Sequence, residues 1–304
     1  MRDHGADPVS RRHGVRLAGA IAVCLIPAAL GAQGEVDYKK FIAEKAPAIV
    51  AVKMVLTIEG GMGGRTQERE TSLDLSGVVV DETGLVMISA NALTAAQRIG
   101  AGRAGRGGGG AEGEGGAPTL NVKPSNVRVV IPGEEKEHAA VLVATDSNLD
   151  LAFVQILELG DRKLAAVAFD PEAKAEVGEE LIGVGRQSQT FDHAPYFGTI
   201  RVTGEITQPR SMHSFDGRFA ERGIPLFTRS GKAVGVLTSP GGLEPDGGAA
   251  AGGGRGGFGG GLGRAGGAGS AAFLIPAAAV HALVDQAKIQ AKQAKEHGKT
   301  DLGA

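Results

Sequence analysis

Three polar residues stand where a predicted strand begins or ends. Asn91 follows one apolar run, Asp150 precedes the run 151–156, and Arg222 precedes the run 224–227. A carboxylate can orient a base or accept hydrogen bonds, whereas a guanidinium remains charged and only donates them. The amide of Asn91 does not titrate near neutral pH, so it cannot shuttle a proton as a general base does.

A second pattern places an imidazole beside hydroxyl groups. His213 lies between Ser211 and Ser214, and this combination of residue types is the one that nucleophilic catalysis uses. However, no Gly-x-Ser-x-Gly or comparable strained turn surrounds these serines. We therefore interpret 208–220 as an irregular polar surface loop.

Metal and cofactor chemistry find no support in the sequence. The seven His form neither a His-x-x-x-His nor a His-Glu-x-x-His pattern, and there is one Cys. We therefore expect no metal site and no cofactor. The formal net charge of −2 also provides no general attraction to nucleic acid or to an anionic membrane.

A β-hairpin leads directly to Asn91. Val- and Ile-rich runs flank Asp81-Glu82-Thr83-Gly84, a polar turn whose glycine can adopt the positive φ that a tight turn needs. A helix is expected at 36–45, and the other strands of this half at 48–57, 70–80, 126–132, 139–144 and 151–156.

The second half repeats this short-strand pattern after a linker at 158–177. Gly198 and Gly204 lie inside one long predicted strand and indicate bulges. The strands are expected at 181–185, 196–207, 221–227, 233–238 and 272–276, with a helix at 277–296. Two sets of antiparallel strands predict an all-β protein built from a first β-barrel (36–157), a second β-barrel (178–276) and a C-terminal helix (277–297).

Two glycine tracts interrupt the barrels. Much of the chain's total of 50 glycines is concentrated at 100–116 and 241–270. These tracts have no apolar periodicity and cannot bury enough surface to offset the entropy of ordering, so we expect disordered loops.

The N-terminus has the pattern of an export signal. Basic residues precede the apolar run 17–30, and small residues before Gln33 offer a cleavage point, which predicts a signal peptide over 1–32. The run is short for a membrane-spanning helix, so we expect release to the periplasm or the exterior; an uncleaved anchor, which would bring membrane contact, is the alternative. The single Cys24 lies in this run, so the mature chain has no disulfide.

In order and spacing, six segments resemble trypsin-like serine proteases of the HtrA/Deg type. The resemblance covers about 36–286 and implies the chymotrypsin fold, with two Greek-key barrels. It also leads us to expect no appended PDZ domain, because the chain ends soon after the helix. The matching segments are 76–93, 148–152, 178–185, 198–206, 221–236 and 273–276.

This resemblance implies a degenerate catalytic triad. Asp150 matches the family's aspartate, whereas Asn91 stands at the histidine position and Arg222 at the serine position. The run from Ala220 to Leu226 replaces the family's Gly-Asn-Ser-Gly-Gly-Pro-Leu. Asp150 either bonds local backbone amides, as Asp at bends commonly does, or accepts a hydrogen bond from Asn91 with Arg222 supplying a compensating charge.

Three functions are compatible with these residues. The first is an exported, inactive trypsin-like protein that binds an extended peptide or an unfolded protein between its barrels by strand addition. The second is an active serine endopeptidase with a rearranged triad, and the third is a structural or assembly subunit with flexible glycine spacers.

Overall fold

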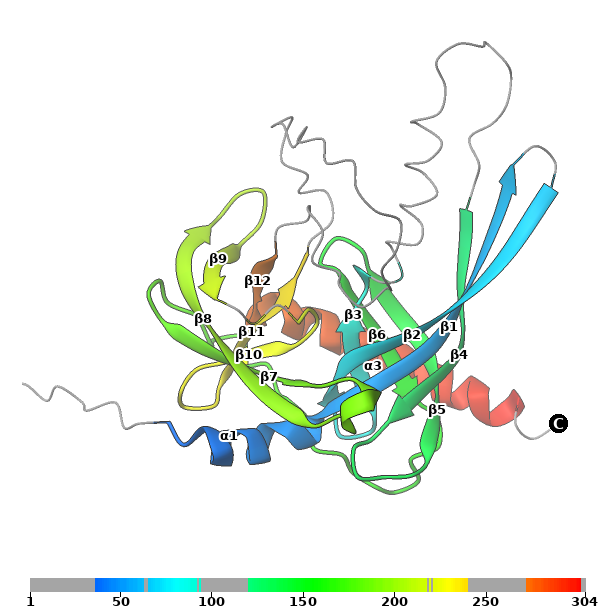
Figure 1. Cartoon of the computed structure of the whole chain (residues 1–304), viewed down its shortest axis with the longest axis horizontal. Helices are drawn as coiled ribbons and strands as arrows, with labels where there is room; N and C mark the ends of the chain where they lie inside the picture. Colours follow the sequence, from blue (N-terminus) through cyan, green and yellow to red (C-terminus); the bar gives the residue numbers. More distant parts are fainter. Residues whose placement is uncertain are drawn as a thin grey trace, which may run out of the picture. The chain divides into compact units, whose positions relative to one another are not determined.

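The computed structural model describes residues 36–62, 65–91, 93, 120–217, 219, 221–239 and 272–301. The predicted signal peptide and both glycine tracts lie outside these residues. The described strands close into two antiparallel barrels, which confirms the predicted double-barrel fold class (Figure 1). The strand order is β1-β2-β3-β6-β5-β4 in the first barrel and β10-β11-β12-β9-β8-β7 in the second.

The observed bounds follow the predicted elements closely in most places. The first barrel contains β1 (Ile49–Met62), β2 (Arg65–Asp81), β3 (Leu85–Ser89), β4 (Leu120–Val130), β5 (Glu137–Asp146) and β6 (Leu151–Ile156). The second contains β7 (Glu180–Arg186), β8 (Pro195–Ile206), β9 (Met212–Gly217), β10 (Pro225–Phe227), β11 (Ala233–Thr238) and β12 (Phe273–Pro276). The helices are α1 (Tyr38–Lys45), the short η1 (Ala46–Ala48) and η2 (Gln189–Phe191), and α3 (Ala277–Asp301).

The hairpin of β2 and β3 forms as its turn residues predict. Gly84 has a φ of +90°, and its amide donates to the carbonyl of Asp81 at 3.0 Å. The Asp81 side chain accepts from the amide of Thr83 at 2.9 Å, which closes the turn. The pairing then runs from Gly77 opposite Ile88 to Asp81 opposite Leu85, and it delivers the end of β3 to the candidate site.

Both faces of β3 are buried, which explains its continuous apolar sequence. Val86 and Ile88 belong to the core cluster of the first barrel. Leu85 and Met87, on the opposite face, belong to a second cluster that also contains second-barrel residues such as Phe227. The two barrels therefore share a hydrophobic core in addition to the one inside the first barrel.

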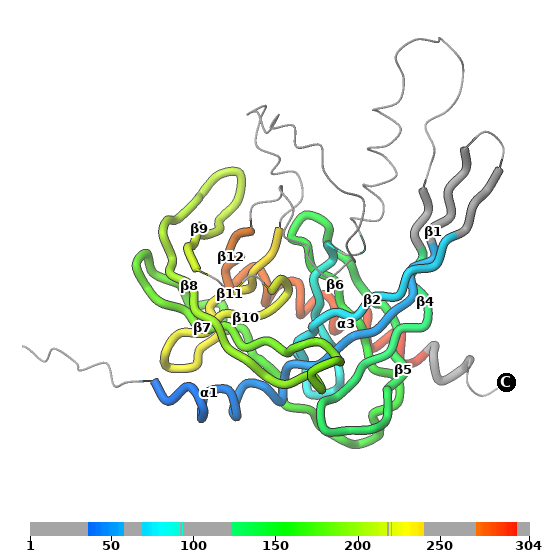
Figure 2. The backbone as a smooth tube through the Cα atoms, in the orientation of Figure 1, coloured from blue at the N-terminus to red at the C-terminus, as the bar shows by residue number. Residues whose placement is uncertain are grey.

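Helix α3 follows β12 directly, as the orange-to-red tube shows in Figure 2. It buries one face through Val280, Val284 and Ala287. Near the end of the helix, Lys295 donates to the carbonyl of Thr83 at 2.8 Å, so a helix that follows the second barrel contacts the β2–β3 turn of the first. Among the helices within the described ranges, none is long and apolar enough to cross a bilayer.

An arginine ties the second barrel to the start of the first. The guanidinium of Arg186, at the end of β7, donates to the carbonyls of Ala46 and Ile49, both at 2.6 Å, and of His193 at 2.9 Å. Burial lowers the pKa of Arg186 from its ordinary value. All three partners are backbone oxygens. The Arg186 side chain therefore holds the backbone at Ala46 and Ile49 next to the backbone at His193.

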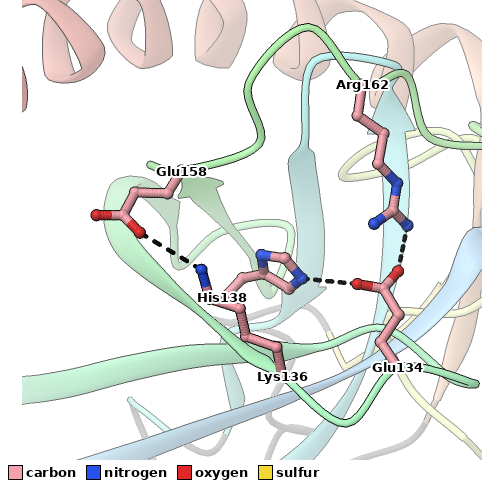
Figure 3. A network of polar contacts seen from close by, with 5 residues as sticks. All are labelled: Glu134, Lys136, His138, Glu158 and Arg162. Atoms are coloured by element: carbon pink, nitrogen blue, oxygen red, sulfur yellow. Dashed lines mark hydrogen bonds and ion pairs between the residues drawn. The ribbon is translucent and has the colours of Figure 1, made fainter.

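The segment 158–177, predicted as a linker, packs against the first barrel. The amide of Val167 donates to the carbonyl of Val79 at 2.8 Å, and Val167 is buried. Arg162 forms an ion pair with Glu134 of the β4–β5 turn, and Glu134 also contacts the Nε2 atom of His138 at 2.9 Å (Figure 3). Hydrogen bonding by Arg162 is the main cause that lowers the pKa of Glu134 to about 2.

Two predictions about the second barrel are wrong. The segment 208–220 contains strand β9, in which Met212 pairs with Ile206 and Phe215 with Val202 of β8, so cross-strand apolar contacts override its polar composition. Gly198 is in regular register rather than in a bulge, whereas the register does shift next to Gly204, as predicted.

The side chain of Phe219 explains why residue 198 is a glycine. A Cβ atom on Gly198 would lie 2.9 Å from the Cδ2 atom of the Phe219 ring, and one on Gly183 would lie 2.4 Å from its Cε1 atom. Both glycines therefore make room for a buried ring rather than for a change of register.

Candidate functional site

Asp150 is the most buried of the three predicted site residues, with 3 % of its surface exposed. It ends the turn after β5, where Asp146 accepts a hydrogen bond from the amide of Leu149 at 2.9 Å. Its own φ is +59°, a left-handed conformation that Asp tolerates better than most residues. Its backbone carbonyl accepts from the amide of Ala90 at 3.0 Å, which holds β6 against the end of β3.

The carboxylate of Asp150 receives hydrogen bonds from both barrels. Its Oδ2 atom accepts from the hydroxyl of Ser89, at the end of β3, at 3.1 Å. The same atom accepts from the backbone amide of Ser239, directly after β11, at 3.0 Å. The expected bond to a backbone amide is therefore present, but its donor lies 89 residues away in the sequence and not in the local bend.

Asn91 is linked to Asp150 through Ser89. The backbone amide of Asn91 donates to the Ser89 hydroxyl at 3.2 Å, and that hydroxyl donates to Asp150. Ser89 therefore relays a hydrogen bond between the two predicted positions. The direct bond from the Asn91 side chain to Asp150 and the compensating charge from Arg222 stay predictions.

The loop that carries Arg222 packs against the end of β3. Its neighbour Gly223 has a φ of +79°, and its amide donates to the carbonyl of Leu237 at 2.8 Å. A Cβ atom at position 223 would lie 2.5 Å from the backbone nitrogen of Ser89, so only glycine fits this approach. The structure thus brings residues 91 and 150 to one serine, Ser89, and places Gly223, the residue after Arg222, against the backbone of the same serine.

Glu221 is a partly buried carboxyl group, next to Arg222, that the sequence analysis did not identify as a candidate. It accepts a hydrogen bond from the hydroxyl of Tyr196 on β8 at 2.7 Å and one from the hydroxyl of Ser76 on β2. Burial raises the pKa of Glu221, and these two bonds oppose the rise. Burial, followed by the bond to Glu221, also raises the pKa of Tyr196.

The alternative pairing of His213 with Ser214 has the wrong geometry for catalysis. His213 lies in strand β9 with 8 % of its surface exposed, which corrects the prediction of a surface loop. Ser214 is the next residue of the strand, so its side chain points to the opposite face. Its hydroxyl donates to the carbonyl of Gly204 at 3.4 Å and accepts from Thr203 at 3.1 Å.

Metal-binding groups do not gather anywhere in the part of the chain that the structure describes. No set of three or more His, Cys, Asp and Glu side chains there could hold an ion. What Ser89, Asp150 and the adjacent loop offer chemically is hydrogen bonding and charge.

These contacts define a class of fold: two six-stranded antiparallel barrels with a buried carboxylate that bonds to both of them. Residues 75–236, more than half of the chain, match the trypsin-like peptidase domain. The chain therefore belongs to this family and has a trypsin-like serine protease fold. A search of curated proteins gives no significant match.

Proposed function

We propose that this protein is a catalytically inactive member of the trypsin-like family, of the HtrA/Deg type, that binds extended peptides or unfolded proteins. The observation that carries the proposal is the composition of the cluster around Ser89. A buried Asp150 is present, but residue 91 is Asn and residue 222 is Arg. This cluster contains neither an imidazole nor a serine at the positions that resemble the family's base and nucleophile.

Proteolysis by the family mechanism needs all of these groups together. The nucleophile requires a hydroxyl or thiol and a base that takes its proton. When triad members are removed, only residual catalysis remains, and it depends on substrate binding and the oxyanion hole. Ala220 and Ile224 replace two glycines of the family pattern, which further opposes a working oxyanion hole.

Cleavage of unfolded casein tests the catalytic half of the proposal. We expect no fragments above background from the purified protein, with an active trypsin-like protease as the positive control. The matched variant restores the family pattern through Asn91→His together with Ala220→Gly, Glu221→Asn, Arg222→Ser and Ile224→Gly. Casein fragments from the unaltered chain that persist after Arg222→Ala would contradict the proposal and favour a rearranged triad.

Loss of the triad is compatible with peptide binding. Strand addition relies on backbone hydrogen bonds and does not require the triad. We expect casein-derived peptides to slow amide exchange at 221–226 and 237–239, while the turn 228–232 serves as the internal control. Absence of binding to every peptide would remove the binding role and favour an assembly subunit.

Export is the third part of the proposal, and the sequence of the N-terminus supports it. We expect the chain to leave the cytoplasm and to lose residues 1–32, which gives a periplasmic or extracellular protein. Mass spectrometry of the chain recovered from an exporting host checks this. A recovered mass that includes the whole N-terminus, in the membrane fraction, would indicate an uncleaved anchor instead.

A further inference from the structure

The segment before β10 is anchored through alternate residues. The ring of Phe219 occupies the space that two glycines of the second barrel leave, and Gly223 packs against the backbone of Ser89 in the first barrel. Glu221 lies midway between these two anchors in the sequence, and its own contacts are polar. Arg222 follows it directly, so the same anchors hold the backbone of the candidate site.

The carboxyl group of Glu221 joins the two barrels. Its Oε2 atom accepts a hydrogen bond from the hydroxyl of Tyr196 on β8 at 2.7 Å, and its Oε1 atom accepts one from the hydroxyl of Ser76 on β2. A Cβ atom at Gly185 of β7 would overlap the Oε2 atom, so glycine at this position makes room for the carboxyl group. Three strands from two barrels therefore form a fitted site for one side chain.

The two hydrogen-bond partners of Glu221 are neutral hydroxyl groups. They stabilise a carboxylate less than an ion pair does, whereas burial penalises the charged form. Burial accordingly raises the pKa of Glu221, and the two hydrogen bonds oppose the rise.

Three charged residues lie next to this site along the chain. Arg222 is the neighbour of Glu221 in the sequence. Arg186 is the neighbour of Gly185, but its guanidinium donates to backbone carbonyls. Asp74 is exposed and lies on the same face of β2 as the bonding serine. These residues and the tyrosine hydroxyl are the titratable groups that a change of pH has to be separated from.

We propose that Glu221 is a pH-sensitive latch, which holds 221–223 against both barrels when it is protonated and releases this segment when it is ionised. The inference rests on the proposed peptide-binding function and adds its regulation: peptide binding is stronger in acid. A protonated carboxyl group can donate one hydrogen bond and accept another, so both hydroxyls keep a partner in the closed state.

The direction of the switch follows from linkage. The folded-state pKa of Glu221 lies above the ordinary value of 4.5. The latch is therefore fully effective below the ordinary value, and its contribution is lost as the pH rises through the folded-state pKa. Above that pH, the ionised carboxylate is better solvated in water than in its site, which favours release of the segment.

Hydrogen exchange in the absence of peptide tests the latch itself. The amides of Gly223 and Leu237 report on the segment, because they donate to the carbonyls of Leu237 and Ile224 at 2.8 and 3.3 Å. Their protection factors should fall about tenfold as the pH rises from about 5 to about 8. The amide of Gly84, in the β2–β3 turn, is the internal control and should keep its protection.

Variants assign the pH dependence to Glu221. Glu221→Gln resembles the protonated form and keeps every histidine, so its protection factors should stay constant over the same range. Tyr196→Phe and Ser76→Ala each remove a bond that opposes the raised pKa, so protection should be lost at a higher pH. A purely structural role would instead lower protection equally at every pH. Glu205→Gln, which removes an exposed carboxyl group of β8, is the matched control, and thermal unfolding checks that each variant is folded.

Peptide affinity is the second readout. The casein-derived peptide that binds most tightly should bind severalfold more weakly at about pH 8 than at about pH 5, because it then has to order a released segment. Glu221→Gln should abolish this difference, which also controls for ionisation of the peptide itself.

The possible outcomes separate the two proposals. Protection that does not depend on pH, or that falls equally in Glu221→Gln, overturns the latch while the peptide-binding function stands. Falling protection with an unchanged affinity overturns its regulatory role. Falling protection in the unaltered chain alone supports the latch even if no peptide binds at either pH, and in that case only the binding function is overturned.

Discussion

At the scale of single residues, Asp150 fixes the arrangement of the cluster. Its Oδ2 atom is the shared acceptor for Ser89 and for the amide of Ser239. A buried N–H group that loses its acceptor costs about 1–3 kcal/mol, so this carboxylate contributes to stability whether or not it serves catalysis. That role alone gives a reason for Asp at this position in a chain with Asn91 and Arg222.

Replacing Asp150 by Ala should therefore destabilise the protein by about 3 kcal/mol. The change leaves the Ser239 amide without its acceptor and places Ala at a φ of +59°. Asp150→Asn is the control: it keeps one oxygen acceptor and tolerates the left-handed conformation, so we expect a loss of about 1 kcal/mol. Urea unfolding measures both, and equal losses would show that the hydrogen bonds of Oδ2 matter little.

The raised pKa of Glu221 predicts that the stability of the folded protein depends on pH, and Glu221→Gln should abolish this dependence. Because the folded-state pKa is raised above the ordinary value of 4.5, this group favours folding at low pH, and the contribution is lost as the pH rises through the folded-state pKa. The stability of the unaltered protein relative to Glu221→Gln should therefore fall from about pH 4 to about pH 8. A difference in urea midpoints that stays constant over this range would mean that burial does not penalise the carboxylate.

The sequence singled out Asp150 as a candidate residue but did not predict the contacts that it makes. Asp150 was identifiable because it stands between a polar bend and an apolar strand. Ser89, Ser239 and Glu221 were not, because their roles depend on partners 61, 89 and 145 residues away along the chain. A serine that ends a strand has no local signal that distinguishes it from a surface serine.

At the scale of elements, the strands form where turn chemistry and apolar alternation agree. The β2–β3 hairpin was predictable from its turn, whereas β9 was not, since its sequence from Met212 to Gly217 has only two large apolar residues. Its pairing partner β8 supplies the missing contacts, and such tertiary effects are absent from a local pattern. The close approach of Phe219 to Gly198 is likewise a tertiary effect that mimics the signal of a bulge.

Replacing Arg186 should destabilise the protein strongly, because its side chain joins the end of β7 to η1 and the start of β1. Arg186→Met should cost about 3 kcal/mol, because the carbonyls of Ala46, Ile49 and His193 would each lose a charged donor. Arg186→Lys should cost less, since an ammonium reaches only some of the three oxygens. Chemical denaturation compares them, and a Met variant as stable as the unaltered protein would contradict the role assigned to this residue.

The ion pairs of Glu134 predict that the folded protein becomes less stable in acid. The folded-state pKa of about 2 lies below the ordinary value of 4.5, so the stability it provides is present above 4.5 and is lost as the pH falls toward 2. Solvent around this turn limits the effect to about 1 kcal/mol or less. Glu134→Gln should remove the dependence, which amide exchange of 162–167 at about pH 6 and about pH 3 measures. Identical acid sensitivity in the variant would assign the effect elsewhere.

At the scale of the whole molecule, the family's double barrel is held together by contacts that do not involve catalysis. Three such contacts do not involve residues 91 and 222. They are the shared core around Met87 and Phe227, the hydrogen bond from α3 to the β2–β3 turn, and the bonds of Arg186 to the start of the first barrel. A fold that is stable without its chemistry can retain its binding surface after the reactive groups are replaced.

Reaction with a fluorophosphonate probe tests the central claim most directly, because the probe labels only a serine that a neighbouring base activates. Intact-mass measurement after incubation should show the unmodified mass, while an active serine protease in the same tube is labelled completely. A stoichiometric adduct on any serine of this chain would contradict the account and show that an active nucleophile exists outside the cluster of Asn91, Asp150 and Arg222.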